Sequence, residues 1–570
     1  MAAGDAPRSW ARAYTVALAA AALLATASTG AAQIKLFPDV LPETKMPAPE
    51  SVPAPPVLQD EAPGSFRVEG LEAPGIDAIG LEGGFRADFY RGAERTLVEP
   101  LLAGLPTDVR LPALRDLTVR VLITGSAIGG ADGALLEARV DRLVALGDLQ
   151  QAAALLDQLP PTNRDSGLAR LAVEVALLTA DDEQACALGE AIGGAGQAVF
   201  WDRLTMFCRL RDGDEAGAQL AVDLLRETGD DPLTLAVADV AITGDPARPL
   251  PALRHPTALQ LALLRIAGHP LPAEALADPA PPMLAAYARS PVLVPDLPLD
   301  LAEQALLLGA LPVDQLRARY AAADPGARPD AAGEAGALAR AGAWQRFEAT
   351  SDPATRARVV EEAWRAAPGE ARFVVALVFG PALLDLPDDA RTLPGAASIA
   401  RVLLADGRFL PATRWLALLQ AERDPEAAGM APLFALAGVG GAGQVPVPDR
   451  RTLAAWAETR DDPAPELPLL LTLLAGTGAE IDGALWWSQL EAPFVRAGRV
   501  VSPAVFRAAE VARAGRRTSE AVLASLALLD GDPTATSGQA LVEALRTLRA
   551  VGLEGEARGI AIQSALLAGL

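Results

Sequence analysis

Lysine is almost absent from this chain. Only Lys35 and Lys45 occur among its 49 basic residues, and all the others are arginine. Beyond Lys45 the chain therefore has no lysine for a phosphate-binding P-loop, a Schiff base or a Ser–Lys dyad. Coding bias toward GC-rich codons is the simplest explanation of such a composition. The absence excludes three lysine-dependent kinds of active site from most of the sequence.

Histidine, cysteine and aromatic residues are also scarce. His255 and His269 are the only histidines, and Cys186 and Cys208 the only cysteines. Because both cysteines are assigned to a structural role, a Cys/His zinc site has no plausible ligand set. The 72 acidic residues are too many for one catalytic pair to stand out. We therefore predict no metal, no cofactor, no catalytic residue and no enzymatic activity, although a glycosidase-type carboxylate pair is not excluded.

Positive charge is also in deficit. The formal net charge is −23, which argues against a nucleic-acid partner because a phosphate backbone needs a basic surface. Hydrophobic residues make up 51% of the chain but aromatic residues only 4%, so the apolar mass is mostly alanine and leucine. This composition suits closely packed helices. A length of 570 residues predicts several domains or one extended repeat array.

Long hydrophobic runs are confined to the N-terminus. Residues 1–32 have the pattern of a signal peptide: Arg8 and Arg12, an apolar run from Ala13 to Ala27, then small residues up to Ala32. The run is too short to span a bilayer, and no cysteine follows that would mark a lipoprotein. We expect an exported chain, periplasmic or secreted, with no transmembrane segment beyond the signal peptide.

Residues 33–84 are predicted to be a Pro/Gly-rich linker. Eight prolines between Pro38 and Pro63 favour extended chain, and glycine-rich turns follow. The linker is a spacer or, alternatively, a tether that docks on a partner. The apolar alternation from Val68 to Leu81 predicts either a strand or a segment lying across the first helices.

The stretch from Leu136 to Asp245 repeats one pattern: helix, tight turn, helix, short break. The turns lie about 33 residues apart, a period typical of stacked helix pairs, at Gly147-Asp148, Ala180-Asp181, Gly213-Asp214 and Gly244-Asp245. The aspartates stand where they can cap the second helix of each pair. The same pattern returns in weaker form at Gly407, Gly515 and Gly552.

These patterns predict an all-α fold, an α-solenoid of stacked antiparallel helix pairs. We divide it into an N-terminal helical-repeat region over 85–245, an irregular proline-rich connector or hinge over 246–300, and a C-terminal helical-repeat region over 301–570. Each hairpin is too small to bury both of its faces alone, so neighbouring hairpins must stack. Short helices are expected within the connector, for example Ala258–Ala267 and Met283–Ala288.

Two of the repeats resemble a known family. The segments ALGDLQQAAALLDQLP and LRDGDEAGAQLAVDLLRE are similar to the second halves of tetratricopeptide-like repeats. The chain also resembles, at the level of fold, the large helical-repeat proteins of the bacterial envelope. The resemblance implies protein–protein interaction along a concave face and therefore one or more protein partners in the envelope.

Four residues are candidate sites. Cys186 and Cys208 flank the turn at 193–196 almost symmetrically, so in an antiparallel hairpin they would lie level and form a disulfide, which export permits. Inert buried thiols are the alternative. Trp486 and Trp487 are adjacent, and on a helix they point about 100° apart. Either each fills a different helix interface, or one is exposed and binds a partner or a sugar.

The sequence thus favours an exported, non-catalytic scaffold or adaptor in the bacterial cell envelope. One alternative is an envelope protein that acts on peptidoglycan from a small catalytic region within a helical superstructure. Another is a solenoid that binds a glycan or peptide through exposed aromatic residues such as Trp487. A compact α+β unit around a cleft would favour the enzyme. The sequence predicts no oligomeric state.

Overall fold

The computed structural model describes residues 75–126, 128, 133–159, 166–192, 198–244, 250, 252–326, 332–439, 448–488 and 499–570. The chain divides into two compact units, Met1–Gly70 and Leu71–Leu570, and every described residue belongs to the second. The predicted signal peptide and the linker up to residue 74 lie outside the described residues.

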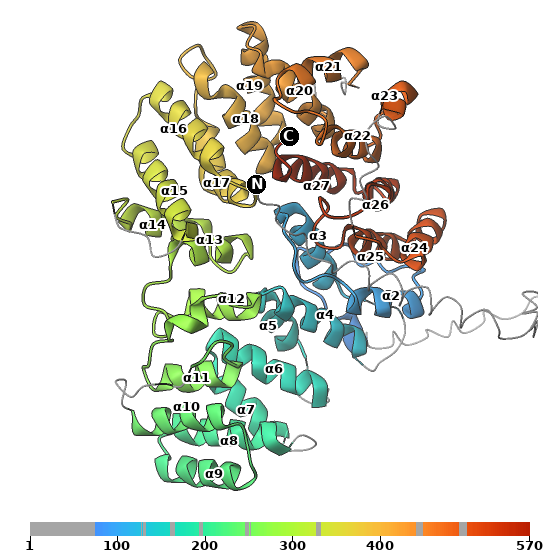
Figure 1. The fold of residues 1–570 in the computed structure, drawn as a ribbon. Helices are drawn as coiled ribbons and strands as arrows, with labels where there is room; N and C mark the ends of the chain where they lie inside the picture. The colour runs from blue at the N-terminus through green and yellow to red at the C-terminus, as the bar shows by residue number, and fades with distance from the viewer. Residues whose placement is uncertain are drawn as a thin grey trace, which may run out of the picture. The chain divides into compact units, whose positions relative to one another are not determined.

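The described part of the chain is all-helical. It contains 26 α-helices and no strand, which confirms the predicted fold class (Figure 1). Within these residues no helix is both long enough and apolar enough to cross a membrane. Residues 75–81 form no strand: Ile76–Ala78 is a 3₁₀ turn, and the Asp77 carboxylate accepts the Leu136 N–H at 2.9 Å, so this segment lies across the start of a helix.

The N-terminal repeats contain the predicted helix pairs. The helices are α2 (Arg95–Ala103), α3 (Pro112–Leu122), α4 (Ala134–Ala145), α5 (Leu149–Asp157), α6 (Ser166–Thr179), α7 (Asp182–Ile192), α8 (Ala198–Arg211) and α9 (Glu215–Glu227). Helices α4 and α5, α6 and α7, and α8 and α9 pack as consecutive pairs. Helix α2 begins at Arg95, so the first ten residues of the predicted repeat region form turns instead of helix.

The three turns have the same geometry. Gly147, Ala180 and Gly213 have left-handed backbone conformations, with φ of 79°, 65° and 80°. In each pair the following aspartate accepts a backbone N–H three residues later and so caps the second helix. These bonds join Asp148 to Gln151, Asp181 to Gln184, and Asp214 to Gly217. The acidic residues of these three turns are thus helix caps, as predicted, whereas Asp245 of the fourth turn lies outside the described residues.

The proline-rich middle packs against the repeats. After α10 (Pro232–Thr243), which ends the N-terminal repeat region, it contains α11 (Ala258–Ile266), the 3₁₀ helix η3 (Ala273–Leu276) and α12 (Pro281–Arg289), close to the short helices expected there. Helix α11 contacts both α10 and α6, and α12 contacts α6 and α4. A capping box between Thr257 and Gln260 starts α11.

The C-terminal region continues the helical pattern. Its elements are α13 (Leu299–Leu307), α14 (Val313–Ala322), α15 (Ala332–Glu348), α16 (Pro353–Ala366), α17 (Ala371–Phe379), η4 (Gly380–Leu383), η5 (Leu393–Gly395), α18 (Ala396–Ala405), α19 (Phe409–Ala421), α20 (Glu426–Ala437), α21 (Arg450–Glu458), α22 (Leu467–Gly476), α23 (Gly483–Ser488), α24 (Pro503–Ala514), α25 (Thr518–Leu529), α26 (Gly538–Ala550) and α27 (Glu554–Leu567).

The recurring turns of this region are only partly as predicted. Gly407 lies between the packed helices α18 and α19, and Gly552 between α26 and α27. Both have left-handed backbone conformations, with φ of 72° and 89°. At the third turn the prediction was wrong by one residue. Gly515 has φ of −82°, and Arg516 takes the left-handed conformation at 51°. The helix α24 ends at Ala514, and the Gly515 N–H still bonds to the helix at Val511, so the reversal comes one position later.

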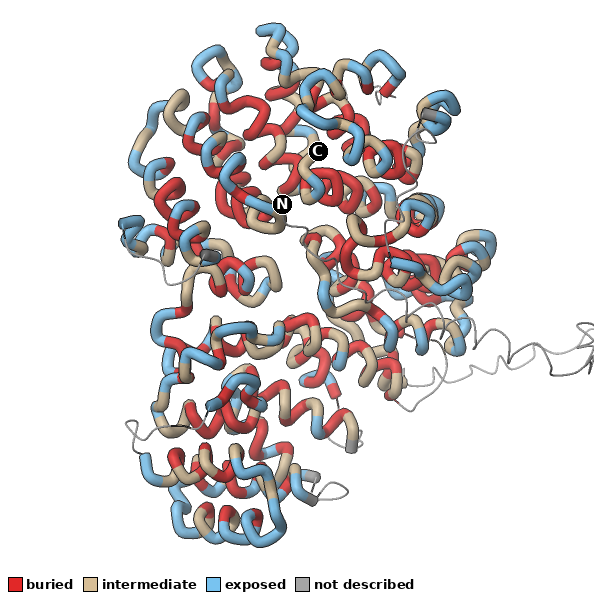
Figure 2. Tube along the Cα trace, viewed as in Figure 1, coloured by how far each residue is buried: buried red, intermediate tan, exposed pale blue. Residues whose placement is uncertain are grey.

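Helices from the N-terminal and C-terminal ends of the described chain pack against each other. Helix α2 contacts α25, and α3 contacts both α25 and α27 (Figure 1). In a simple repeat array each unit touches only its neighbours. Helix α27 also contacts α18, α20 and α22, and it is buried on several sides (Figure 2). The path of the chain through the second unit therefore closes on itself.

Polar contacts hold this closure. Arg110 pairs with Glu370 and with Asp532, the latter at 2.9 Å, and Arg120 pairs with Glu556 at 2.7 Å. At the start of α2, the Glu520 carboxylate accepts the Glu94 N–H at 2.7 Å across 426 residues of sequence. Arg517 binds both of these glutamates, at 2.6 and 3.2 Å.

Gly531 lies at the tightest point of the closure. It has φ of 75°, its carbonyl accepts the Arg110 N–H at 3.2 Å, and a Cβ added there would overlap the Asp108 carbonyl oxygen. Gly552, in the next turn, has φ of 89° and open space around its Cα. The two glycines thus share a backbone conformation but not a close neighbour.

We predict that Gly531→Ala destabilises the closure more than Gly552→Ala does. Both substitutions add left-handed strain of about 1–2 kcal/mol, and only Gly531→Ala must also push the Asp108 backbone aside, at about 1–3 kcal/mol more. Thermal unfolding should show the greater loss of stability in Gly531→Ala. Hydrogen exchange should show that the amides of α2 and α3 lose protection in that variant. Equal effects of the two substitutions would contradict this account of the closure.

Candidate binding groove at the tryptophan pair

Both candidate tryptophans are exposed. Trp486 and Trp487 lie on the short helix α23 with 37% and 67% of their surface accessible. The sequence left open whether each fills a helix interface; the structure places neither in the core. Five other tryptophans are all buried: Trp201, Trp344, Trp364, Trp415 and Trp456. Among the described tryptophans, exposure is therefore confined to this pair.

Trp486 lines a groove between α22, α23 and α26, which we call the tryptophan groove. Its volume is about 940 Å³, and its floor includes Thr472 and Ala475 of α22 and Val542 of α26. Gly483 permits the other tryptophan to fold back along the helix, because a Cβ at Gly483 would lie 3.2 Å from the Trp487 Nε1. Small residues on the helix thus make room for the large rings.

The tryptophan groove contains charges of both signs. Glu480 and Glu543 line it together with Arg546 and Arg549. Arg513 pairs with Glu543 at 2.5 Å, while Arg549 approaches Glu554 at 3.9 Å. Within the described residues, the exposed guanidinium of Arg546 makes no hydrogen bond or ion pair. Arg546 is therefore a charged group next to an exposed ring with its donors available.

A second hollow adjoins the first. Its volume is about 650 Å³, and it is lined by Arg450 and Arg451 at the start of α21 and by Leu485 of α23. Glu480 and Ile481 line both hollows. Helix α23 therefore stands on a ridge between two neighbouring depressions, an arrangement that presents its side chains to an extended ligand.

Sequence reasoning found the tryptophans but not the rest of the groove. Arg546 and Gln539 lie on α26, more than fifty residues beyond α23, and nothing local in the sequence ties them to Trp486. The only available indication was the amphipathic pattern of α26, whose buried leucines face α22 and α25 and leave these polar residues outside.

Within the described residues, no group of three or more His, Cys, Asp or Glu side chains could hold a metal ion. Burial raises the pKa of Asp148 and of Asp406, and in each case a nearby arginine, Arg115 or Arg408, opposes the rise. Both carboxyls lie at helix ends, where they serve the fold. The geometry offers binding surfaces.

The two cysteines lie at disulfide distance. Cys186 of α7 and Cys208 of α8 have Cα atoms 5.7 Å apart, within the range of disulfides, and the structure joins them. Helix α7 belongs to one predicted pair and α8 to the next, so the link staples consecutive repeats as predicted. The turn at 193–197 that they flank lies outside the described residues.

Comparison of the chain with protein-family models, with curated proteins and with solved structures finds no match. The function must therefore be argued from the groove and the charges around it.

We predict that removing the disulfide destabilises the α7–α8 repeats. Closing a loop of 22 residues stabilises the fold by about 3 kcal/mol in the chain-entropy model. The double substitution Cys186→Ser with Cys208→Ser should lower the free energy of unfolding by about that amount, measured by denaturant titration.

Reductant serves as the control for this substitution. It should destabilise the unchanged protein and leave the double variant as it is. Free thiols in non-reduced peptides from exported protein would refute the disulfide itself.

Proposed function

We propose that this chain is an exported, non-catalytic scaffold or adaptor that binds a partner protein at the tryptophan groove. The observation that supports this most is the joint exposure of Trp486 and Trp487 beside Arg546, whose guanidinium has no ion pair among the described residues. Tryptophan and arginine are the residue types most enriched among the few that dominate binding at protein interfaces.

The free energy of burying apolar surface favours a binding role for helix α23. A tryptophan can bury 150–250 Å² against a partner, and leaving two adjacent rings in water gains the folded chain nothing. On a chain with only 4% aromatic residues, such a pair is unlike the rest of the surface. Exposed apolar clusters with a polar rim are typical of interaction sites.

The charges of the groove suit a polypeptide. Glu480 and Glu543 can accept backbone or side-chain N–H groups, while Arg546 can donate to carbonyls or carboxylates. A partner surface with both kinds of group would satisfy all three. The net charge of −23 opposes nucleic acid, as it did at the sequence level.

Export to the cell envelope is part of the same proposal. It rests on the signal-peptide pattern of residues 1–32 and on the closeness of Cys186 to Cys208, a pairing that an oxidising compartment maintains. The tetratricopeptide-like resemblance of the repeats is a further expectation, and it agrees with a role in protein–protein interaction.

Peptidoglycan or another glycan is the second candidate ligand. Exposed aromatic rings stack on sugar faces, and Trp487, at 67% accessible, is free to do so. With such a ligand, the proposed role of the groove is binding through its exposed rings.

We predict that Trp486→Ala with Trp487→Ala weakens partner binding at least about tenfold, because both rings lose their contact area. The partner is identified by affinity capture from crosslinked envelopes, with and without residues 33–84, and its dissociation constant is then measured with purified protein. In a parallel assay both variants are sedimented with purified peptidoglycan.

Leu410→Ala is the matched control, since Leu410 on α19 is 74% exposed but does not line the groove. It should bind like the unchanged protein. Full binding by the double tryptophan variant would refute the groove as the docking site. Tryptophan-dependent sedimentation with peptidoglycan and no captured protein would favour the glycan.

A further inference from the structure

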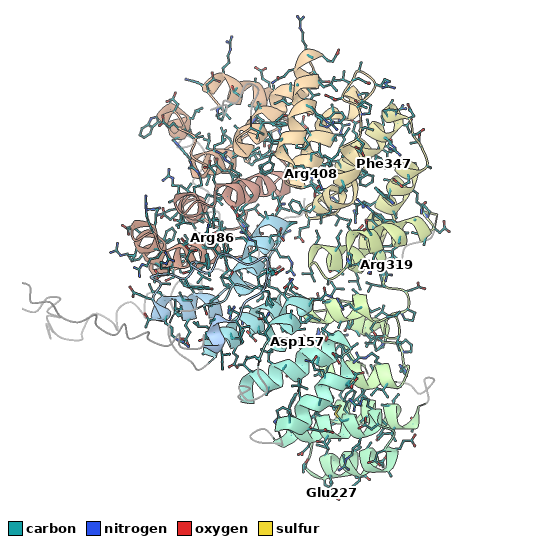
Figure 3. The ribbon with its side chains drawn as sticks, turned by 180° about the vertical axis from the view of Figure 1, so that it is seen from behind. Arg86, Asp157, Glu227, Arg319, Phe347 and Arg408 are labelled. Atoms are coloured by element: carbon teal, nitrogen blue, oxygen red, sulfur yellow. A yellow bond between two sulfur atoms is a disulfide. The ribbon has the colours of Figure 1, made fainter. Side chains whose placement is uncertain are left out.

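A separate pocket lies where α5, α6, α12 and α14 meet, away from the tryptophan groove. Its volume is about 560 Å³, and its polar lining comes from Gln150, Thr179, Tyr287, Arg289, Gln315 and Arg319. We call it the arginine pocket; Arg319 is labelled on α14 in Figure 3. No aspartate or glutamate lines it, although the chain has 72 of them.

Within the part of the chain that the structure describes, neither arginine of the pocket has an anionic partner. When the Gln150 amide is oriented with its oxygen toward Arg289, that neutral oxygen accepts from both terminal nitrogens of the guanidinium, at 2.7 and 3.0 Å. Within the described residues, the Arg319 guanidinium has no hydrogen bond or ion pair. Other arginines show the usual outcome: Arg340, for example, pairs with Glu303 in the core. In a chain with so many carboxylates, two arginines without an anionic partner among the described residues suggest that the anion comes from a ligand.

A buried hydroxyl adds a third donor. Tyr287 is only 1% exposed and lines the pocket, and within the described residues its hydroxyl has no hydrogen-bond partner. Burial raises its pKa, so the hydroxyl stays protonated and remains a donor at any physiological pH. A buried polar group without a partner carries a free-energy cost. An acceptor oxygen in the pocket would remove that cost.

The dipole of α14 also favours an anion in the pocket. Pro312 and Gln315, which also line the pocket, lie at the start of α14, a ten-residue helix whose N-terminal dipole favours negative charge. The volume falls within the range of small-molecule sites. Guanidinium groups present paired N–H donors that match the oxygens of carboxylate and phosphate.

We propose that the arginine pocket binds a small organic anion through its carboxylate or phosphate oxygens. Arg289 and Arg319 supply the charge, and Tyr287 and Gln315 supply neutral hydrogen bonds. Because α5 and α6 belong to the N-terminal repeats and α14 to the C-terminal region, the ligand links the two. The site is independent of the tryptophan groove, so either proposal can fail alone.

The test is calorimetric titration of the full exported chain with citrate, succinate and inorganic phosphate, and with uncharged succinamide as the ligand control. The unchanged protein should bind at least one of the anions with a sub-millimolar dissociation constant and should not bind succinamide. Citrate or succinate without phosphate identifies a carboxylate ligand, and the reverse result identifies a phosphate ligand.

Variants then assign the binding to the pocket. Arg289→Gln with Arg319→Gln should weaken binding at least about tenfold, because each lost charge-assisted bond contributes about 1.5–3 kcal/mol. Tyr287→Phe should weaken it several-fold. Arg346→Gln removes the same charge from a surface pair with Glu362, outside the pocket, and should leave the affinity unchanged.

Three results would overturn the proposal. The first is that no anion binds the unchanged protein at 10 mM ligand, roughly the weak end of useful affinity. The others are an unaltered affinity in the double variant and an equal loss of affinity in Arg346→Gln. Near-UV circular dichroism checks that the double variant is folded. Should it not be, Arg289→Gln and Arg319→Gln are tested singly, each with the same expected direction.

Discussion

One buried amide joins three distant parts of this fold. The Gln563 side-chain oxygen accepts the Ala113 N–H at the start of α3, at 2.8 Å, and its nitrogen donates to the Ala405 carbonyl at the end of α18, at 2.9 Å. Helix ends leave backbone groups unsatisfied, and in a buried interface those groups need a partner. Gln563 lies on α27, so a single side chain satisfies a backbone group at each of these two helix ends.

Arginine performs the same task elsewhere. Arg414 donates to the carbonyls of Leu383, Leu384 and Leu386, and Arg372 and Arg558 each reach a carbonyl on another helix. A guanidinium spreads five donors over a planar fork, whereas a lysine ammonium is a compact, strongly hydrated charge. Whatever its origin in coding bias, the near absence of lysine thus matches a fold in which long basic side chains close helix ends across interfaces.

Local features of the sequence predicted local structure well. The turns at Gly147, Ala180 and Gly213, their aspartate caps and the nearness of Cys186 to Cys208 all follow from patterns within about 35 residues, the scale of one helix pair. The closure could not be predicted, because Arg110 and Asp532 are partners without any local relation. The tryptophan groove could not be predicted for the same reason. Trp486 stood out in the sequence, but Arg546 comes next to it only through the packing of α22 against α26.

The contact between Glu94 and Glu520 has a consequence for how the protein is made. A ribosome or export channel delivers α2 and α3 first, yet the surfaces that cover them belong to α25 and α27, which emerge some 426 residues later. The N-terminal pairs can assemble on their own local contacts, while α2 and α3 wait with apolar faces uncovered. A chain truncated before α25 would lack the helices that cover α2 and α3, so it would expose part of the surface of these two N-terminal helices.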